Sequence, residues 1–348
     1  MPTTLLSQLR DRVVIDVDSM DPDVARRHTK EARFCDMTSN QAIALGEILK
    51  AKDSETNQAS QVLKAAVQTV KAVNAGVAFG PDQLNDMADV MTALFAKDVL
   101  PNLSSEGHVH AQTLPSLAKS TEGTIAHAKR LVKRFEAVGI PKSRVCIKIP
   151  ATPQGILACR ELQGSGINTL ATIVFSLPQA LAASQAGCLY VAPYFNELCV
   201  HAKRPEAWVK YKSTVEEHPA IPVIDSIIKA FKALESSTLV MPASIITTEE
   251  ILALAALHPH HLTISPKILD QLAADVTTEL NSVTAPGNLS SVDETLIKTD
   301  YLANNAEALA NAFAVDNELK RKMDEALEIF EEAEEETRNL FLEELGRV

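Results

Sequence analysis

VCIKIPATPQG, residues 145–155, is the stretch from which the fold can be read. Its first five residues are rich in β-branched side chains and predict a short buried strand. Thr152 followed by Pro153 predicts a helix start, because threonine can cap the first turn and proline lacks only an N–H that has no helical partner there. Lys148 therefore lies near the C-terminal end of a strand that leads directly into a helix.

Lys148 faces away from Ile147 and Ile149, because successive side chains of a strand alternate between its two faces. In a barrel, the isoleucine face would contact the helices and the lysine would point at the axis. A buried lysine whose pKa falls to roughly 7–8 can attack a carbonyl carbon and form a Schiff base. A lysine that extends from the strand end to solvent is the alternative that this stretch leaves open.

The rest of the chain predicts a (β/α)8 TIM barrel. Helical patterns separate seven further segments with the character of short strands, and such alternation is typical of parallel βαβ units. The predicted strands cover 12–18, 33–40, 107–112, 168–175, 188–194, 237–244 and 261–265; helical spacing is clearest at 55–75, 83–98, 120–138 and 153–165. A doubly wound open sheet is the competing fold, but no GxGxxG follows any strand. We expect residues 1–315 to form one barrel domain, with its active site at the C-terminal ends of the strands.

The composition excludes several classes of protein. The net charge of −12 without a basic cluster argues against a nucleic-acid partner, and no apolar run reaches the roughly 18 residues of a membrane span. The five cysteines are widely spaced and lack a CxxC pair, which favours reduced thiols. Because the N-terminus also lacks a secretion signature, we expect a cytoplasmic protein.

Residues 316–348 form a distinct acidic tail, with 12 acidic against 5 basic residues. Its apolar residues recur at spacings of three or four, which predicts an amphipathic C-terminal helix packed on the barrel. Partner binding by this helix is the alternative, and the sequence leaves a homodimer open.

The chain resembles the transaldolase family. The resemblance is carried by the segment from Val145 to Gly187, which contains the lysine strand and the strand after it, and by VMPAS (240–244) and LTISPKIL (262–269). It implies a (β/α)8 barrel of the class I aldolase type, in which Lys148 forms a Schiff base with a ketose donor. That chemistry implies no cofactor and no metal, and a small-molecule carbonyl or ketose as the partner.

Further site residues follow from the resemblance. The family's VVADTGD corresponds without a gap to VVIDVDS (13–19), so the strand-one carboxylate that moves the proton of a substrate hydroxyl falls on Asp16. Asp18, on the same face, is the alternative. Thr172 corresponds to the threonine that helps to fix a catalytic water.

Three more residues are candidates for substrate binding. The family's TTNP turn reads Thr38-Ser39-Asn40-Gln41 here, and Ser244 corresponds to the serine of the family's ASFR motif. For Thr38, Asn40 and Ser244, ordinary turn or cap chemistry is the competing interpretation.

Two departures concern the catalytic water. The family's strand-three glutamate is replaced by Gln112, and a phenylalanine of strand six by Tyr194. A glutamine cannot carry a proton as a carboxylate does. Gln112, Thr172 and Tyr194 together resemble the fructose-6-phosphate aldolase branch, where such a trio holds the water and the tyrosine acts as acid and base.

Two other departures concern phosphate. Glu197 replaces the family's strand-six arginine, and Ile246 replaces the arginine of ASFR. Arginine suits phosphate because it donates paired, charge-assisted hydrogen bonds. We therefore expect poor binding of phosphorylated sugars unless Lys203 or Arg204 compensates.

The histidines outside this set receive structural interpretations. His110 shares a face with Gln112, and we expect it to be satisfied by its neighbours, with an acid–base role as the alternative. His258, His260 and His261 look like a metal cluster, but we interpret them as loop residues away from the active face.

The sequence thus predicts an enzyme that makes or breaks a C–C bond through a Lys148 Schiff base with an unphosphorylated hydroxyketone. An orthodox pentose-phosphate transaldolase with substitute phosphate ligands is one alternative. A barrel that only binds a carbonyl metabolite or partner is another, and a third uses the imine for condensation or dehydration.

Overall fold

The computed structural model describes residues 3–29, 32–52, 57–74, 79–201, 203–280, 283–285 and 292–347. Within them, seven short parallel strands alternate with helices. The strands are β1 (Val14–Val17), β2 (Val109–Gln112), β3 (Val145–Pro150), β4 (Asn168–Val174), β5 (Tyr190–Pro193), β6 (Leu239–Val240) and β7 (His261–Ile264).

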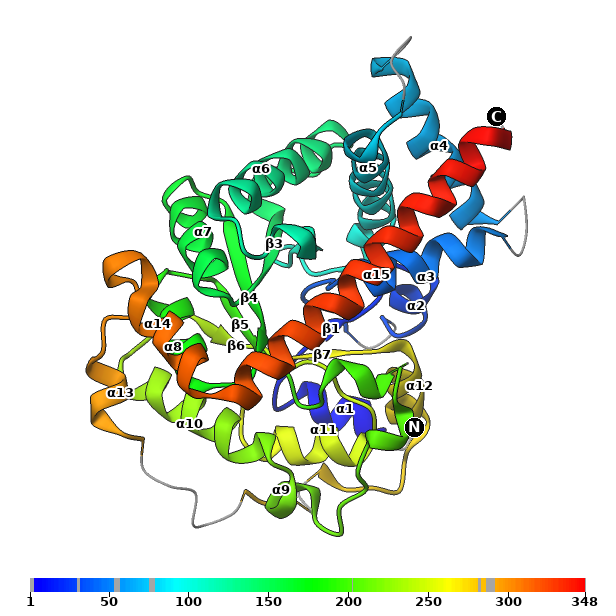
Figure 1. Ribbon diagram of the computed structural model, residues 1–348. Coiled ribbons are helices and arrows are strands. Elements are labelled where there is room, and N and C mark those ends of the chain that lie inside the picture. Colours follow the sequence, from blue (N-terminus) through cyan, green and yellow to red (C-terminus); the bar gives the residue numbers. More distant parts are fainter. Residues whose placement is uncertain are drawn as a thin grey trace.

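Helices connect the strands and surround them (Figure 1). Those before β3 are α1 (Leu5–Arg10), α2 (Pro22–Arg27), α3 (Gln41–Lys52), α4 (Gln58–Val73), α5 (Pro81–Val99) and α6 (Thr121–Ala137). After β3 come α7 (Pro153–Gly164), α8 (Leu177–Gln185), α9 (Thr214–Glu217), α10 (Ala220–Ala233), α11 (Thr248–Ala255), α12 (Pro266–Ala274), α13 (Glu294–Lys298), α14 (Ala303–Val315) and α15 (Asn317–Arg347). None of the helices in these ranges is both long enough and apolar enough to cross a bilayer.

The strand order is that of a parallel α/β barrel, with no ladder between β6 and β7 in the described residues. β2 to β6 pair in sequence, and the last strand, β7, pairs with the first, β1. Met37 joins the two groups, because it forms parallel bridges with Val17 beside it and with Val109 on its other side. The predicted (β/α)8 barrel is the fold of the chain.

The predicted second strand, 33–40, differs most from expectation, and the predicted strand 237–244 is reduced to the two residues of β6. Phe34 and Met37 form single bridges, and no continuous strand is present there. Carboxylates take the N–H groups that a ladder would use: Asp36 N–H donates to Asp16, and His108 N–H donates to Asp36. Side chains that compete for backbone donors interrupt regular pairing.

The lysine strand and its helix form as predicted. Thr152 is the N-cap of α7, and its hydroxyl accepts the Gly155 N–H at 2.9 Å; Pro153 occupies the first turn. Position 155 requires glycine, because a Cβ there would lie 2.1 Å from the Pro150 carbonyl oxygen. The strand can therefore turn into the helix within three residues.

Two hydrophobic clusters fill the molecule. The larger one lies between the strands and the surrounding helices and includes Ile147 and Ile149. The smaller lies inside the barrel, where Leu170, Tyr190 and Met241 pack against Phe330 of α15.

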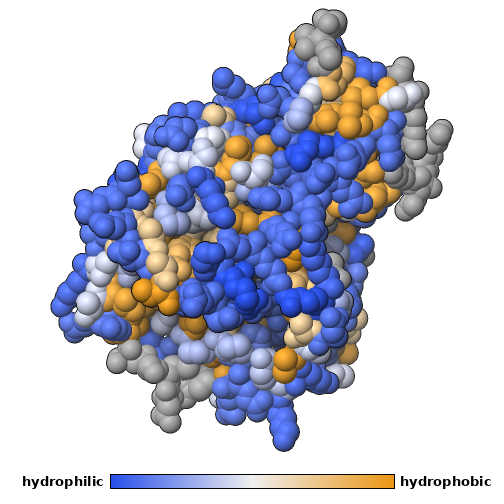
Figure 2. Space-filling view, viewed as in Figure 1, coloured by the Kyte–Doolittle hydropathy of each residue, from blue (hydrophilic) through white to orange (hydrophobic). Residues whose placement is uncertain are grey.

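α15 crosses the C-terminal mouth of the barrel (Figure 1). It contacts the short helices 115–117 and 198–201, which follow the C-terminal ends of β2 and β5. Its apolar face packs inward, and Figure 2 shows that its outward face is hydrophilic. The helix thus separates the barrel interior from solvent on the side where the lysine strand ends.

Candidate active site

Lys148 lies inside the barrel on β3, between β2 and β4. Its side chain is 2% exposed, and Gln112 and Leu170 are its register partners on the two neighbouring strands. Desolvation lowers the pKa of Lys148, and the charge of Asp18 opposes this shift. Among the described residues, none forms a hydrogen bond or an ion pair with its amine. A partly desolvated and unpaired amine is the form of lysine that can act as a nucleophile.

Asp18 is the carboxylate whose charge acts on the Lys148 amine and raises its pKa. Burial is the main cause of the raised pKa of Tyr194, and the charge of Asp18 adds to it. Burial lowers the pKa of His201, and the charge of Asp18 opposes that shift. One of its oxygens accepts the Thr38 hydroxyl at 2.6 Å. Asp18 therefore shares one electrostatic environment with Lys148, Tyr194 and His201.

Asp16 lies one layer deeper in the barrel. Its two oxygens accept the Asp36 N–H at 2.9 Å and contact His261 Nδ1 at 2.9 Å. Burial raises the pKa of Asp16 to about 6, although His261 opposes the shift. The two candidate carboxylates thus differ in their contacts: Asp16 bonds to His261 and the Asp36 backbone, whereas the charge of Asp18 acts on the lysine.

The part of the barrel interior around Asp16 is polar and contains Asp36, His110 and His261. His110 Nε2 lies 2.7 Å from Asp36, whereas its buried Nδ1 has no partner among the described residues, so the expected satisfaction by neighbours holds for one ring nitrogen and not for the other. The interpretation of His261 as a loop residue is wrong: it begins β7, is buried, and pairs with Asp16. Its acidic partner is 245 positions away in the chain, so local sequence carried no signal of it.

The segment 38–40 contributes polar atoms next to Asp18, at the C-terminal end of β1. The Thr38 hydroxyl contacts Thr263 at 2.5 Å in addition to Asp18, which joins the ends of β1 and β7. Asn40 uses its side-chain oxygen to accept the Ile43 N–H at the start of α3. Thr38 thus belongs to the site, and Asn40 also has the cap role that was its alternative.

Thr172 and Tyr194 meet as expected for two residues around a catalytic water. The Thr172 hydroxyl donates to the Tyr194 hydroxyl at 3.2 Å, and both side chains are buried. Gln112 Oε1 is buried and has no partner among the described residues. An unsatisfied buried acceptor beside the lysine register is suited to hold a water.

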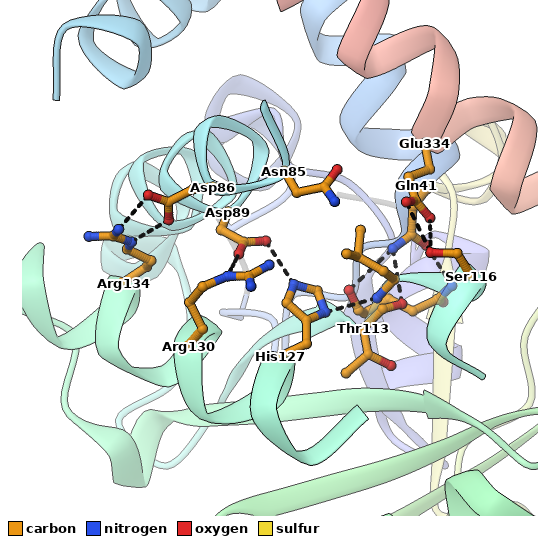
Figure 3. A network of polar contacts seen from close by, with 12 residues as sticks. Gln41, Asn85, Asp86, Asp89, Thr113, Ser116, His127, Arg130, Arg134 and Glu334 are labelled. Carbon is orange, nitrogen blue, oxygen red and sulfur yellow. Dashed lines mark hydrogen bonds and ion pairs between the residues drawn. The ribbon is translucent and has the colours of Figure 1, made fainter. Parts of the chain in front are cut away.

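Gln41 is a residue that sequence reasoning missed. It stands where the family's TTNP turn has proline, and its Oε1 accepts the Gln112 Nε2–H at 2.6 Å. Its own amide donates to the carbonyls of Gln112 and Thr113. These contacts lie at the edge of a polar network in which His127 links Asp89 of α5 to the chain after β2 (Figure 3). Gln41 therefore fixes the orientation of Gln112.

Ser244 and His201 meet at the rim. Ser244 has a positive φ of 61°, a conformation that non-glycine residues rarely adopt, and its hydroxyl lies 2.8 Å from His201 Nε2. His201 was not singled out from sequence, because nothing local connects it with the seventh predicted strand.

Within the part of the chain that the structure describes, two groups of residues have metal-ligating atoms close together, Asp16–Cys35–His261 and Glu197–Cys199–Glu325. In the first, Asp16 and His261 bind each other. In the second, both carboxylates pair with arginines. Neither group presents a free set of donors.

Comparison with known proteins agrees with this geometry. The family model Transaldolase/Fructose-6-phosphate aldolase matches residues 15–341. A transaldolase from Xanthomonas oryzae pv. oryzae is 31% identical over 305 residues, which are 87% of this chain and 88% of the relative. A transaldolase from Trichormus variabilis is 30% identical over 349 residues, covering 100% of this chain and 98% of the relative.

The chain belongs to the transaldolase/fructose-6-phosphate aldolase family. It is an enzyme of the class I aldolase type, as the resemblance of Lys148 and its strand implied. Among solved structures, an IMP dehydrogenase/GMP reductase-like protein from Corynebacterium glutamicum matches 72% of this chain and 63% of its own, with a TM-score of 0.39 and 11% identity. That likeness is too low to add to the argument.

The region where the family's phosphate arginine would stand is occupied by an ion pair. Glu197 accepts two hydrogen bonds from Arg321 of α15, at 2.9 and 3.0 Å. At the other replaced position, the Ile246 N–H donates to the buried carboxylate of Glu250 at 2.7 Å. Lys203 and Arg204, the two candidates for compensation, pair with Glu332 and Glu325 of α15.

Proposed function

We propose that this transaldolase-family enzyme uses the Lys148 amine to form a Schiff base with an unphosphorylated hydroxyketone, and makes or breaks a C–C bond through that intermediate. The observation that carries the proposal is the buried, unpaired Lys148 amine with a lowered pKa, at the end of a barrel strand. The proposed reaction needs a proton acceptor at the reacting hydroxyl and a water that hydrolyses the imine.

Asp18 supports the first requirement better than Asp16. Its charge acts on the lysine, and the Thr38 hydroxyl holds it in place. Asp16 is engaged by His261 and the Asp36 backbone. We therefore assign the proton shuttle to Asp18 and a supporting role to Asp16.

Thr172, Tyr194 and Gln112 support the second requirement. The bonded hydroxyls of Thr172 and Tyr194 can hold a water and pass a proton, and the unpartnered Gln112 oxygen can accept from the same water. Ser244 and Asn40 remain candidates for donor hydroxyl contacts.

The preference for an unphosphorylated donor rests on charge. A phosphate near Glu197 would meet a carboxylate whose arginine partner is already bound in two hydrogen bonds. The Lys203 and Arg204 side chains are likewise paired with acids of α15. At roughly 1.5–3 kcal/mol for each charged hydrogen bond, loss of these contacts makes phosphate binding weak.

The five free thiols support a cytoplasmic location.

The test is borohydride trapping with dihydroxyacetone and with fructose, followed by mass measurement of the Lys148 peptide. We expect a reduced adduct on Lys148 and none in Lys148→Met, with fructose 6-phosphate a poorer donor than fructose. Absence of an adduct across a panel of hydroxyketones would overturn the proposal and favour a barrel that only binds a carbonyl compound. An adduct with dehydrated product would instead assign the imine to condensation chemistry.

A further inference from the structure

A cavity of about 420 Å³ opens beside Tyr194. It lies between the C-terminal ends of β4 and β5, the segment 195–211, the start of α10 and the first turns of α15. Its volume falls within the roughly 300–1,000 Å³ of small-molecule sites. Lys148 does not line it, but Tyr194 does, and the Tyr194 hydroxyl bonds to Thr172 on the barrel side. Tyr194 is therefore a wall shared by the cavity and the proposed catalytic site.

Aromatic and aliphatic side chains form about half of the cavity wall, and polar and charged side chains form the rest. Phe175 meets the Tyr194 ring edge to face, with centroids 5.7 Å apart. Phe195 stacks on His218 at 3.8 Å, and Tyr211 meets the same imidazole edge to face at 5.1 Å. Burial lowers the pKa of His218 to about 4, so it is a neutral ring near pH 7. Further wall residues are Val200, Trp208, Val209, Val223 and Ile224.

The charged groups at the rim are already paired. Arg321 binds Glu197 through two hydrogen bonds, and Arg204 binds Glu325. Lys322 lies 3.6 Å from Glu197 and 5.6 Å from the centre of the Phe175 ring. An incoming phosphate would have to displace a carboxylate from its arginine, whereas an apolar group displaces none of these contacts. The rim thus disfavours a phosphate and leaves the aromatic interior available.

We infer that this cavity binds the substituent of the aldehyde acceptor, and that this substituent is apolar and about the size of an aromatic ring. The inference rests on the proposed function, because it assumes a donor bound at Lys148. In the addition, the α-carbon of the Lys148 imine loses a proton to give the enamine, and the enamine carbon bonds to the aldehyde carbon as the C=O π bond opens. The aldehyde oxygen takes a proton to become a hydroxyl, and water hydrolyses the imine to release the product and restore the Lys148 amine. Tyr194 connects the cavity with the proposed catalytic site, because it lines the cavity and bonds to Thr172.

The first experiment measures kcat/KM for a series of aldehydes with dihydroxyacetone as donor. We expect phenylacetaldehyde to exceed glyceraldehyde and glyceraldehyde 3-phosphate by roughly tenfold or more, the equivalent of about 1.4 kcal/mol. Val223→Phe, which fills the cavity, should remove this preference. Val276→Phe adds the same ring at an exposed position outside the cavity and should leave the preference unchanged. Equal kcat/KM for phenylacetaldehyde and glyceraldehyde in the unmodified enzyme would overturn the inference.

The second experiment detects occupancy without chemistry. Trp208 is the only tryptophan of the chain and lies in the cavity wall, so its fluorescence reports binding there. We expect 2-phenylethanol to change the fluorescence saturably and glycerol to have no effect, with the response lost in Val223→Phe. No saturable change with 2-phenylethanol would refute the cavity assignment even if Lys148 forms its adduct. A saturable change without any Lys148 adduct would refute the proposed reaction and, with it, the acceptor assignment.

Discussion

At the scale of single residues, Lys148 and Asp18 form the pair on which the proposed chemistry depends. Only the neutral amine attacks a carbonyl, so imine formation slows as pH falls below the pKa of Lys148. Asp18 raises that pKa against the lowering effect of burial. In Asp18→Asn the pKa of Lys148 should fall further, and the acid limb of the trapping rate should move to lower pH.

The measurement is the rate of borohydride trapping with dihydroxyacetone between pH 5 and pH 9. Turnover of the C–C step should also fall in Asp18→Asn, by roughly 100-fold or more, as for loss of a general base. Asp16→Asn is the matched comparison. If Asp16→Asn lost turnover of the C–C step and Asp18→Asn kept it, the shuttle would be Asp16.

A second pair, Glu197 and Arg321, sets the response to phosphate. Glu197→Gln removes the charge that accepts two hydrogen bonds from Arg321 and should release those N–H groups, while Arg321 keeps its contacts with Glu318 and Glu325. We expect the ratio of KM for fructose 6-phosphate to KM for fructose to fall by roughly tenfold, the value of one charge-assisted hydrogen bond. Glu318→Gln removes another partner of the same arginine at an exposed position and should leave the ratio unchanged. An unchanged ratio in Glu197→Gln would show that phosphate does not approach this region.

Some residues of the candidate site could be predicted from the sequence, and others could not. Lys148, Thr172 and Tyr194 could be located because each lies at a recognisable strand end. Gln41, His201 and Arg321 could not, because their partners are 71, 43 and 124 positions away. Asp16 and Asp18 share a face of one strand, so only the depth of each in the barrel separates them.

At the scale of elements, the junction of β3 and α7 depends on Gly155. A Cβ at this position would lie 2.1 Å from the Pro150 carbonyl, so Gly155→Ala must displace backbone next to the lysine strand. We expect a loss of roughly 1–3 kcal/mol in the free energy of unfolding, as for overpacking. Gly164→Ala in the same helix meets nothing within 4 Å and should be neutral or slightly stabilising. Urea unfolding of the two variants measures the difference, and equal stabilities would contradict the close approach.

The segment 33–40 shows why one strand could not be predicted as it is. Its pattern is that of a strand, but Asp16 and Asp36 take backbone donors that pairing requires. Which donor a carboxylate takes depends on contacts across the barrel, so composition cannot reveal it. The strand predicted at 237–244 is also shortened, to Leu239–Val240, where the Val240 N–H donates to His260. The remaining strands end close to their predicted positions.

At the scale of the whole molecule, α15 closes the barrel. Its ion pairs to Lys203 and Arg204 are partly exposed, and such pairs typically contribute about 0–1 kcal/mol each. Its apolar face is buried: Met323, Ala326 and Phe330 pack in the cluster inside the barrel. The apolar contacts therefore hold the helix in place, and the ion pairs fix which segment it covers. The amphipathic pattern predicted this helix, but not that it covers the end of the barrel where the lysine strand terminates.

Phe330→Ala tests this arrangement because the Phe330 side chain is fully buried over the barrel interior. Removing a buried phenylalanine should lower the free energy of unfolding by roughly 3–5 kcal/mol. It should also admit water toward Lys148, and weaker desolvation raises the pKa of an amine. The acid limb of the trapping rate should then move to higher pH, opposite to the shift in Asp18→Asn. Leu342→Ala, on the same helix but 47% exposed, should change neither stability nor the limb. If Phe330→Ala were destabilised while the limb kept its position, α15 would support the fold without setting the environment of the lysine.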